Sequence, residues 1–217
     1  MKAPAWLKTW VRARPRLYRF TKWVRRFLLS MVRRYLIDIR PLAIPRFYIY
    51  RLYLFIRRPK GIKLHLACGG IRLPGFVNID HRHTTATDFV CDVTKLPHLS
   101  DSVELIESYH FIEHISHTKV HAMLREWHRV LKPQGRLVIE CPDFDRAIER
   151  YQAGDEQRLK AAIFGLHRFR GDVHLFGYNF ARLKRLLEEC GFGSVERRPT
   201  QDYHVPDGIR AECVKLV

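Results

Sequence analysis

The chain has 217 residues, is 47% hydrophobic and carries a formal net charge of +17, which fits one globular domain with a basic appendage. Its five cysteines are spread out without a CxxC pair, which argues against a disulfide framework and a cysteine zinc site. No stretch of about 18 uncharged apolar residues occurs and arginines interrupt the first residues, so we expect neither a membrane-spanning helix nor a secretory signal.

The positive charge is concentrated at one end of the chain. Residues 1–60 hold 17 Lys and Arg but one acid, Asp38, whereas residues 61–217 are nearly neutral. We therefore predict two parts, a basic aromatic arm at residues 1–60 and a domain at residues 61–217. A mitochondrial presequence is also basic and poor in acids, so composition leaves that targeting alternative open.

Large apolar side chains recur in the arm at steps of three and four residues. They are Leu17, Phe20, Val24, Phe27, Leu28, Met31, Tyr35 and Ile39. This spacing predicts an amphipathic helix, which Pro41 and Pro45 would end. A basic amphipathic helix rich in aromatic residues favours an anionic membrane surface as partner. The alternatives are nucleic acid, or packing on the chain's own domain or a partner protein.

From residue 61 onward, strand patterns alternate with helical ones, which is typical of an α/β sheet. Strands are predicted at residues 63–67, 76–80, 89–92, 103–108, 136–141, 194–198 and 209–216. One helix is predicted at residues 119–132, capped by Ser116 or Thr118 and ended by Pro133 and Gly135. A second is predicted at residues 180–190 with Asn179 as its cap.

Residues that end the predicted strands are candidates for a binding site, because open α/β sheets bind ligands beyond the carboxyl ends of their strands. Gly69 and Gly70 follow the first strand and let the backbone approach a ligand closely. Asp80 ends the second strand, where a carboxylate can accept hydrogen bonds from both ribose hydroxyls. Asp92 ends the third strand beside the same crevice, within reach of an adenine amine.

The spacing of these residues indicates the class of cofactor. Dinucleotide-binding loops read G-x-G-x-x-G, with an acid about 20 residues further on. The stretch "ACGGIRLPG" lacks this spacing, and Asp80 follows Gly69 by only 11 residues. Such a crossover is too short for a helix whose N-terminus would bind a pyrophosphate. S-adenosylmethionine, which has ribose and adenine but no phosphate, fits better.

Four stretches of the sequence carry a family resemblance: "KLHLACGGIRLPGFVNID", "CDVTKLPHLSDSVELIESYHFIEH", "LREWHRVLKPQGRLVIECPD" and "LKRLLEECGF". They occur in the order seen in class I S-adenosylmethionine-dependent methyltransferases, and residues 63–217 look most like the methyltransferase-type-11 group. The resemblance implies a three-layer Rossmann-like fold whose seven-stranded sheet is mostly parallel, with the last strand antiparallel. It also implies an enzyme that uses S-adenosylmethionine.

The same resemblance assigns roles to individual residues. It implies that Ala67, Cys68 and Gly69 embrace the methionine part of the cofactor, that Asp80 binds ribose and that Asp92 lies near adenine. Tyr109 and His110 would border the methyl group.

Two residues depart from the pattern of the family. His65 stands where the broad family has an acid, and Ala67 where it has the first glycine. A histidine would not attract the cofactor's ammonium group, whereas Ala67 is tolerable if its φ is negative. Both remain in the predicted cofactor-binding set, and they motivate a third alternative, a non-catalytic adaptor with a vestigial pocket.

Histidines gather after the fourth predicted strand. His110, His114, His117 and His121 would line one face of an unbroken helix and indicate a metal site. Because a helix break is expected between His114 and His121, we predict no metal. An oxygen acceptor benefits from a general base, and His110, His114 and His174 are the candidates.

Together these observations predict a cytoplasmic methyltransferase that is peripheral to the inner face of a membrane through residues 1–60. Its acceptor is predicted to be a small molecule or glycan, such as a saccharide or a lipid-linked glycan precursor. Residues 144–178 are expected to shape the acceptor pocket. The alternative is an RNA methyltransferase guided by the basic arm.

Overall fold

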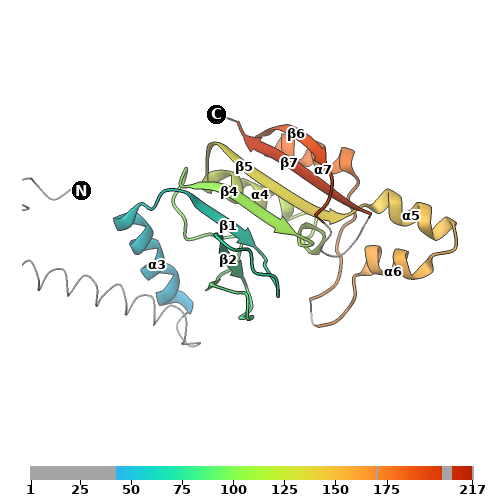
Figure 1. The fold of residues 1–217 in the computed structure, drawn as a ribbon, viewed down its shortest axis with the longest axis horizontal. Helices are drawn as coiled ribbons and strands as arrows, with labels where there is room; N and C mark the ends of the chain where they lie inside the picture. Colours follow the sequence, from blue (N-terminus) through green and yellow to red (C-terminus); the bar gives the residue numbers. More distant parts are fainter. Residues whose placement is uncertain (1–42, 170, 202–206, 217) are drawn as a thin grey trace, which may run out of the picture. The chain divides into compact units, whose positions relative to one another are not determined.

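The structure is a computed structural model that describes residues 43–169, 171–201 and 207–216 (Figure 1). The helix predicted within residues 17–39 lies outside these residues. The aromatic and basic segment that follows it forms helix α3 (Ala43–Arg57). The chain divides into two compact units between Ile49 and Tyr50, inside α3, and the division predicted at residue 60 stays a prediction.

A seven-stranded sheet forms the second unit. Its strands are β1 (Ile62–Leu66), β2 (Val77–Asp80), β3 (Phe89–Val90), β4 (Val103–Tyr109), β5 (Leu131–Pro142), β6 (Phe192–Arg198) and β7 (Gly208–Lys215). They lie in the order β3-β2-β1-β4-β5-β7-β6. Strands β1 to β5 pair in parallel, whereas β7 runs antiparallel to both β5 and β6. The predicted mostly parallel Rossmann-like sheet is thus confirmed.

Helices α4 (Val120–Val130) and α7 (Phe180–Glu189) lie behind the sheet in Figure 1. Each buries the apolar face that its three- and four-residue spacing predicts, with Met123, Leu124 and Trp127 buried on α4 and Leu183 and Leu187 on α7. The indole of Trp127 also donates a 2.9 Å hydrogen bond to the carbonyl of Val93. These faces form much of the core on this side of the sheet.

The ends of the two helices test the predicted caps. Asn179 caps α7 as predicted, since its side-chain oxygen accepts a 2.8 Å hydrogen bond from the backbone of Arg182. The predicted cap of α4 is wrong: Lys119 occupies that position without a side-chain bond, because the Ser116 hydroxyl accepts from the Thr118 amide in the preceding turn. Helix α4 ends at Val130, and the predicted stop residues lie inside β5.

Two short helices, α5 (Phe144–Gln152) and α6 (Glu156–Phe164), follow β5. They pack on each other beyond the carboxyl end of β5 (Figure 1). Between β4 and α4 the chain forms only a short 3-10 helix, η1 (Ile112–His114). The predicted helix break between His114 and His121 is therefore confirmed, and the four histidines do not share one helical face.

The connection from β1 to β2 contains no helix, as its length predicted. Its fold depends on the buried side chain of Asn78. The Asn78 Oδ1 accepts a 2.9 Å bond from the amide of Leu73, and its Nδ2 donates to the carbonyls of Leu73 and Phe76 and to Asp88. Side-chain hydrogen bonds thus position this loop where a crossover helix would otherwise do so.

Candidate functional site

A pocket of about 490 Å³ opens at the carboxyl ends of β1, β2 and β4. The loop after β1, the residues after β2 and β4, and the loop after α6 line it. Its main lining residues are Ala67, Cys68, Gly69, Gly70, Asp80, Arg82, Tyr109, His110, Phe111, His114, Arg168, Phe169 and Asp172. Its size falls within the range of small-molecule sites, about 300–1,000 Å³.

The loop after β1 makes a sharp turn through two residues with positive φ. Ala67 has a φ of +56° and Gly69 a φ of +53°. The condition under which Ala67 would be tolerable, a negative φ, is therefore not met. The turn is fixed because the Cys68 amide donates to the carbonyl of Ile79 (3.1 Å) and the Ile71 amide to that of Cys68 (2.9 Å). A left-handed conformation costs a residue with a Cβ about 1–2 kcal/mol, so Ala67 is strained.

Asp80 connects this loop to the end of β2. Its side chain is only 3% exposed. Its Oδ2 accepts a 2.8 Å hydrogen bond from the amide of Gly69, and its Oδ1 accepts one of the same length from the amide of Arg82. The structure therefore places Asp80 in the pocket wall with both oxygens held by backbone.

Two residues of the predicted cofactor-binding set lie outside this lining. His65 is buried in β1, where its Nδ1 lies 3.1 Å from the Oδ1 of Asn78. Burial lowers the pKa of His65, so its ring is neutral at pH 7. Asp92 is exposed, and its Oδ1 accepts bonds from the amide and hydroxyl of Thr94. Its role beside adenine stays a prediction.

The residues predicted to border the methyl group, and two of the predicted general bases, lie at or just after the end of β4. Tyr109 and His110 line the pocket, and the Tyr109 hydroxyl donates a hydrogen bond to the Glu107 carboxylate. Burial and this carboxylate raise the pKa of Tyr109. His114 also lines the pocket, and its ring packs edge-on against that of His174, with 4.8 Å between their centroids. His174 itself is not part of the lining.

The loop after α6, which lies within residues 144–178, supplies another part of the pocket wall. That this segment shapes an acceptor pocket stays a prediction. The Arg168 Nε lies 2.8 Å from the Oδ2 of Asp172, and this hydrogen bond lowers the pKa of Asp172 to about 2. The guanidinium of Arg82 lies 3.8 Å from the ring centroid of Phe169, which joins the β2 wall to this loop.

The sequence-based expectation covered residues 144–178 as a segment, but it did not single out Arg82, Phe169 or Asp172 as pocket residues. Arg82 follows Asp80 by two residues, and this position beside a strand end was an available signal. The other two stand on an irregular loop without periodicity, so the sequence offers no comparable signal for them.

Comparison with known proteins gives a family match over part of the chain and several similar folds. Residues 74–139 match the family model described as "Methyltransferase domain", whereas no curated protein sequence matches. A solved structure of a Pyrococcus horikoshii OT3 protein has a TM-score of 0.51 at 16% identity, covering 82% of this chain and 93% of that one. A SAM-dependent methyltransferase of Methanosarcina mazei has a TM-score of 0.49 at 16% identity, covering 83% and 99%.

Proposed function

We propose that this chain, whose domain belongs to the class I S-adenosylmethionine-dependent methyltransferases, methylates a hydroxyl of a saccharide or lipid-linked glycan precursor at a membrane surface. The assignment of the domain follows from the family match and the strand order, and S-adenosylmethionine is the cofactor that it implies. The acceptor and the membrane association are the proposal. The observation that carries the proposal is a combination found in one chain. Arginine side chains line the pocket of the domain, and helix α3, which precedes the domain, exposes apolar and basic side chains.

The residues of the pocket fit this cofactor. Asp80 offers a buried carboxylate at the end of β2, and the short loop at Ala67–Gly69 leaves open space, since a Cβ built on Gly69 or Gly70 would meet no atom within 4 Å. We assign ribose to Asp80 and the methionine part to this loop. When bound, the cofactor supplies an electrophilic methyl group on a sulfonium.

His110 is the residue that we assign as general base. It lies at the end of β4 in the pocket lining, and imidazole accepts a proton near neutral pH. Its task would be to take the proton of the acceptor hydroxyl as the oxygen attacks. His110→Gln should lower the turnover about 10²–10⁴-fold while S-adenosylhomocysteine affinity stays within threefold. Full turnover would remove His110 from this role.

The part of the pocket wall formed by Arg82, Arg168 and Phe169 supports the proposal of a hydroxyl-rich or anionic acceptor. The guanidinium groups of Arg82 and Arg168 lie 3.8 and 5.9 Å from the ring centroid of Phe169, which is exposed. Guanidinium groups donate several hydrogen bonds in a fixed geometry, and the ring offers an apolar face beside them. Arg168 already donates to Asp172, but the buried Nε of Arg82 has no hydrogen-bond partner among the described residues. A polar acceptor could satisfy this donor, whereas an apolar one could not.

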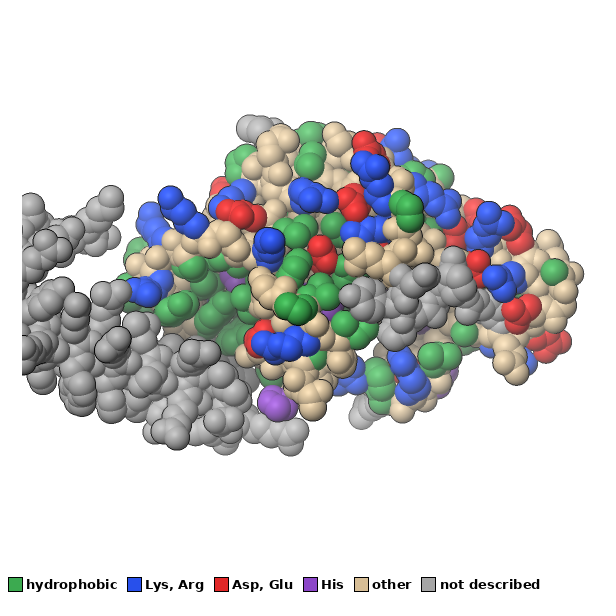
Figure 2. Space-filling view, viewed as in Figure 1, with side chains coloured by type: hydrophobic (Ala, Val, Ile, Leu, Met, Phe, Trp, Pro, Cys, Tyr) green, Lys and Arg blue, Asp and Glu red, His purple; other side chains and the backbone are tan. Residues whose placement is uncertain are grey.

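The exposed apolar side chains of helix α3 support the proposed association with a membrane surface. Leu52, Phe55 and Ile56 recur at helical spacing and are 57%, 51% and 68% exposed, whereas Leu54 on the other side is 4% exposed. Figure 2 shows apolar and basic side chains next to each other in the region of α3. Fully burying one such apolar side chain contributes about 1.5–3 kcal/mol, so burying all three in the membrane interface would hold α3 there. No helix among the described residues is long and apolar enough to cross a bilayer.

Sedimentation with liposomes tests the membrane part of the proposal. A Leu52→Gln/Phe55→Gln/Ile56→Gln variant should lose binding to anionic liposomes by at least tenfold. The matched control is Tyr151→Gln/Phe164→Gln, which removes exposed aromatic side chains from α5 and α6 and should bind like the wild type. Salt-sensitive RNA binding without any liposome binding would instead favour the RNA methyltransferase.

Calorimetry tests the enzymatic part independently. The full-length protein should bind both S-adenosylmethionine and S-adenosylhomocysteine, and it should transfer a labelled methyl group to a polar-lipid or glycan fraction. If neither cofactor binds at millimolar concentration, the non-catalytic adaptor is the correct reading.

A further inference from the structure

Glu113, on η1 at the edge of the pocket, is a buried carboxylate without a hydrogen bond. It is 2% exposed, and neither carboxylate oxygen has a hydrogen-bond partner among the described residues. The closest cationic candidates are too far away for a hydrogen bond: the Nδ1 of His110 lies 3.6 Å and the Nε2 of His174 3.9 Å from its Oε1. Burying a carboxylate without hydrogen-bond partners is unfavourable, and a cation bound beside it would compensate this cost.

The two neighbouring imidazoles are oriented like metal ligands. The Nδ1 of His114 lies 2.8 Å from the carbonyl oxygen of Val173, and the Nδ1 of His174 lies 2.7 Å from that of Ala162. A carbonyl only accepts, so each Nδ1 must carry the proton and donate it. In a neutral ring this leaves the lone pair on Nε2, and metal-binding histidines are commonly held through such a bond from the other nitrogen.

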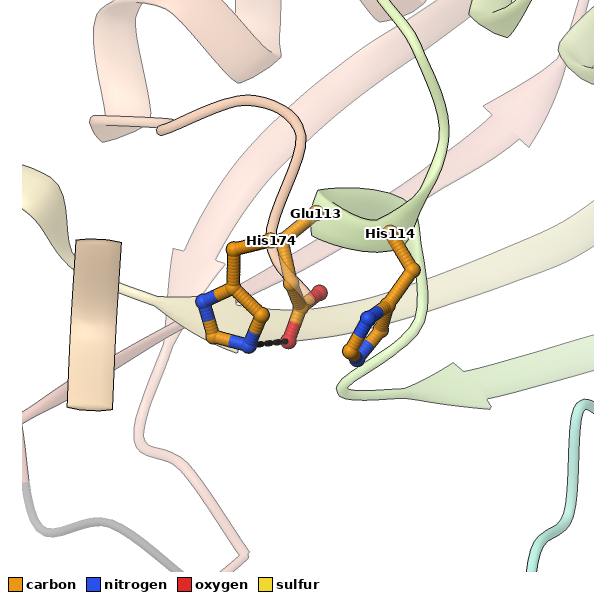
Figure 3. Close-up of side chains that lie close together, drawn as sticks. All are labelled: Glu113, His114 and His174. Carbon is orange, nitrogen blue, oxygen red and sulfur yellow. Dashed lines mark ion pairs between the residues drawn. The ribbon is translucent and has the colours of Figure 1, made fainter. Parts of the chain in front are cut away.

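The three side chains also meet in space (Figure 3). One ligand atom from each of Glu113, His114 and His174 can be chosen so that all three lie within 4.8 Å of one another. Around a tetrahedral zinc ion with bonds of about 2.0–2.2 Å, ligand atoms stand about 3.4 Å apart. The 3.9 Å between the Glu113 Oε1 and the His174 Nε2 is close to that separation. Without a cation between them, the carboxylate would face the lone pair of His174.

Backbone hydrogen bonds fix the two segments that carry these ligands. The amides of Leu175 and Phe176 donate to the carbonyl of Glu113 at 2.7 and 3.2 Å, and the amide of His174 donates to that of Phe164 at 3.2 Å. The loop after α6 is thereby tied to η1, so the ligand set does not depend on a mobile side chain alone. Such preorganisation favours metal binding over a chance cluster.

We propose that Glu113, His114 and His174 bind one divalent transition-metal ion, with zinc as the representative, beside the pocket. Two imidazoles and one carboxylate suit zinc and its neighbours in the first transition series. Three protein ligands leave one position of a tetrahedral zinc ion for water or another oxygen. The site stands whether or not the domain transfers methyl groups. A role for the ion in holding an acceptor oxygen would rest on the proposed function, because His114 lines that pocket.

Metal titration of the untagged full-length protein tests the site. After treatment with a chelator, the protein should bind one Zn²⁺ per chain with an affinity on the order of micromolar or tighter. His114→Gln and His174→Gln should each weaken binding by about 100-fold or more, beyond the 10–100-fold that loss of an outer-shell partner costs. His117→Gln and His121→Gln, which alter an exposed and a half-buried histidine outside the cluster, should bind within threefold of the wild type.

Two further measurements separate this site from adventitious binding. Co²⁺ bound at the site should show a visible spectrum without thiolate charge transfer, because no cysteine is a ligand. Zn²⁺ should raise the melting temperature of the wild type and of His117→Gln but not that of His114→Gln, with circular dichroism confirming that each variant is folded. The proposal is overturned by absence of stoichiometric binding, by a thiolate spectrum, or by full affinity in folded His114→Gln and His174→Gln.

Discussion

Asp80→Asn is the substitution that most directly tests how the pocket binds its cofactor. In the wild type, two backbone amides donate to the two carboxylate oxygens, each at 2.8 Å. An asparagine side chain has the same shape but only one oxygen, so its NH₂ group must face the amide of either Gly69 or Arg82. A hydrogen bond to a charged group contributes about 1.5–3 kcal/mol. We therefore expect the free energy of unfolding to fall by about 2 kcal/mol.

The same substitution should weaken cofactor binding by a similar amount. The ribose hydroxyls would lose one charged acceptor, and about 2 kcal/mol corresponds to roughly a 30-fold higher Kd. Calorimetry with S-adenosylhomocysteine measures the affinity, and urea unfolding measures the stability. A folded Asp80→Asn protein that binds within threefold of the wild type would refute the assignment of ribose to this carboxylate.

Asp92→Asn is the matched control for this experiment. Asp92 is exposed, and in the described residues its side chain accepts hydrogen bonds only from the amide and hydroxyl of Thr94. Its substitution should therefore change the unfolding free energy by less than about 0.5 kcal/mol. A loss of cofactor affinity comparable to that of Asp80→Asn would instead support the predicted position of Asp92 beside adenine.

Three further substitutions test the energetics of the fold. Ala67→Gly should leave the unfolding free energy unchanged or raise it by up to about 1 kcal/mol, because relief of the positive φ opposes the greater freedom of the unfolded chain; a loss above 1 kcal/mol in urea would contradict this. His98→Phe should remove part of the acid sensitivity, since burial lowers the pKa of His98 to about 3. The unfolded state therefore binds the extra proton below pH 6.5, and stability falls with pH from 6.5 down to about 3. Between pH 6.5 and pH 4.5 this contribution lowers the stability by roughly 2 kcal/mol, and equal slopes in wild type and variant would refute it. Arg210→Met should cost about 3–5 kcal/mol by leaving the Glu140 carboxylate buried without the guanidinium that lies 2.7 Å from it. The Glu140→Gln/Arg210→Met variant should recover most of this loss, and a purely additive loss in denaturant unfolding would exclude the coupling.

The sequence predicted the regular parts of the domain because their apolar periodicity is set by burial. The strands and α4 and α7 were expected within a few residues, since side chains such as Trp127 and Leu183 must face the core. It predicted the glycine loop and Asp80 because strand ends converge at one edge of a parallel sheet. These inferences depend on local spacing, which a single sequence contains.

The remaining features depend on contacts between distant segments. The positive φ at Ala67 belongs to a turn that is held by the hydrogen bond from the Cys68 amide to the carbonyl of Ile79 on the neighbouring strand. The local sequence does not indicate this contact. Likewise, Glu113 and His174 are 61 positions apart, and their meeting follows from the path of the loop after α6. The histidine spacing drew attention to a helical face that does not exist, whereas the cluster that forms takes a ligand from another part of the chain.

The pairing of His65 with Asn78 limits how this pocket can be re-engineered. Replacing His65 by the acid of the broader family would direct a carboxylate at the Oδ1 of Asn78, which now faces the His65 Nδ1 at 3.1 Å. The side-chain amide of Asn78 would have to rotate. It would then lose the hydrogen bonds that it accepts from the amide of Leu73 and donates to the carbonyl of Leu73. A cofactor loop transplanted from another methyltransferase must therefore bring residue 78 with it, because positions 65 and 78 behave as one exchangeable unit.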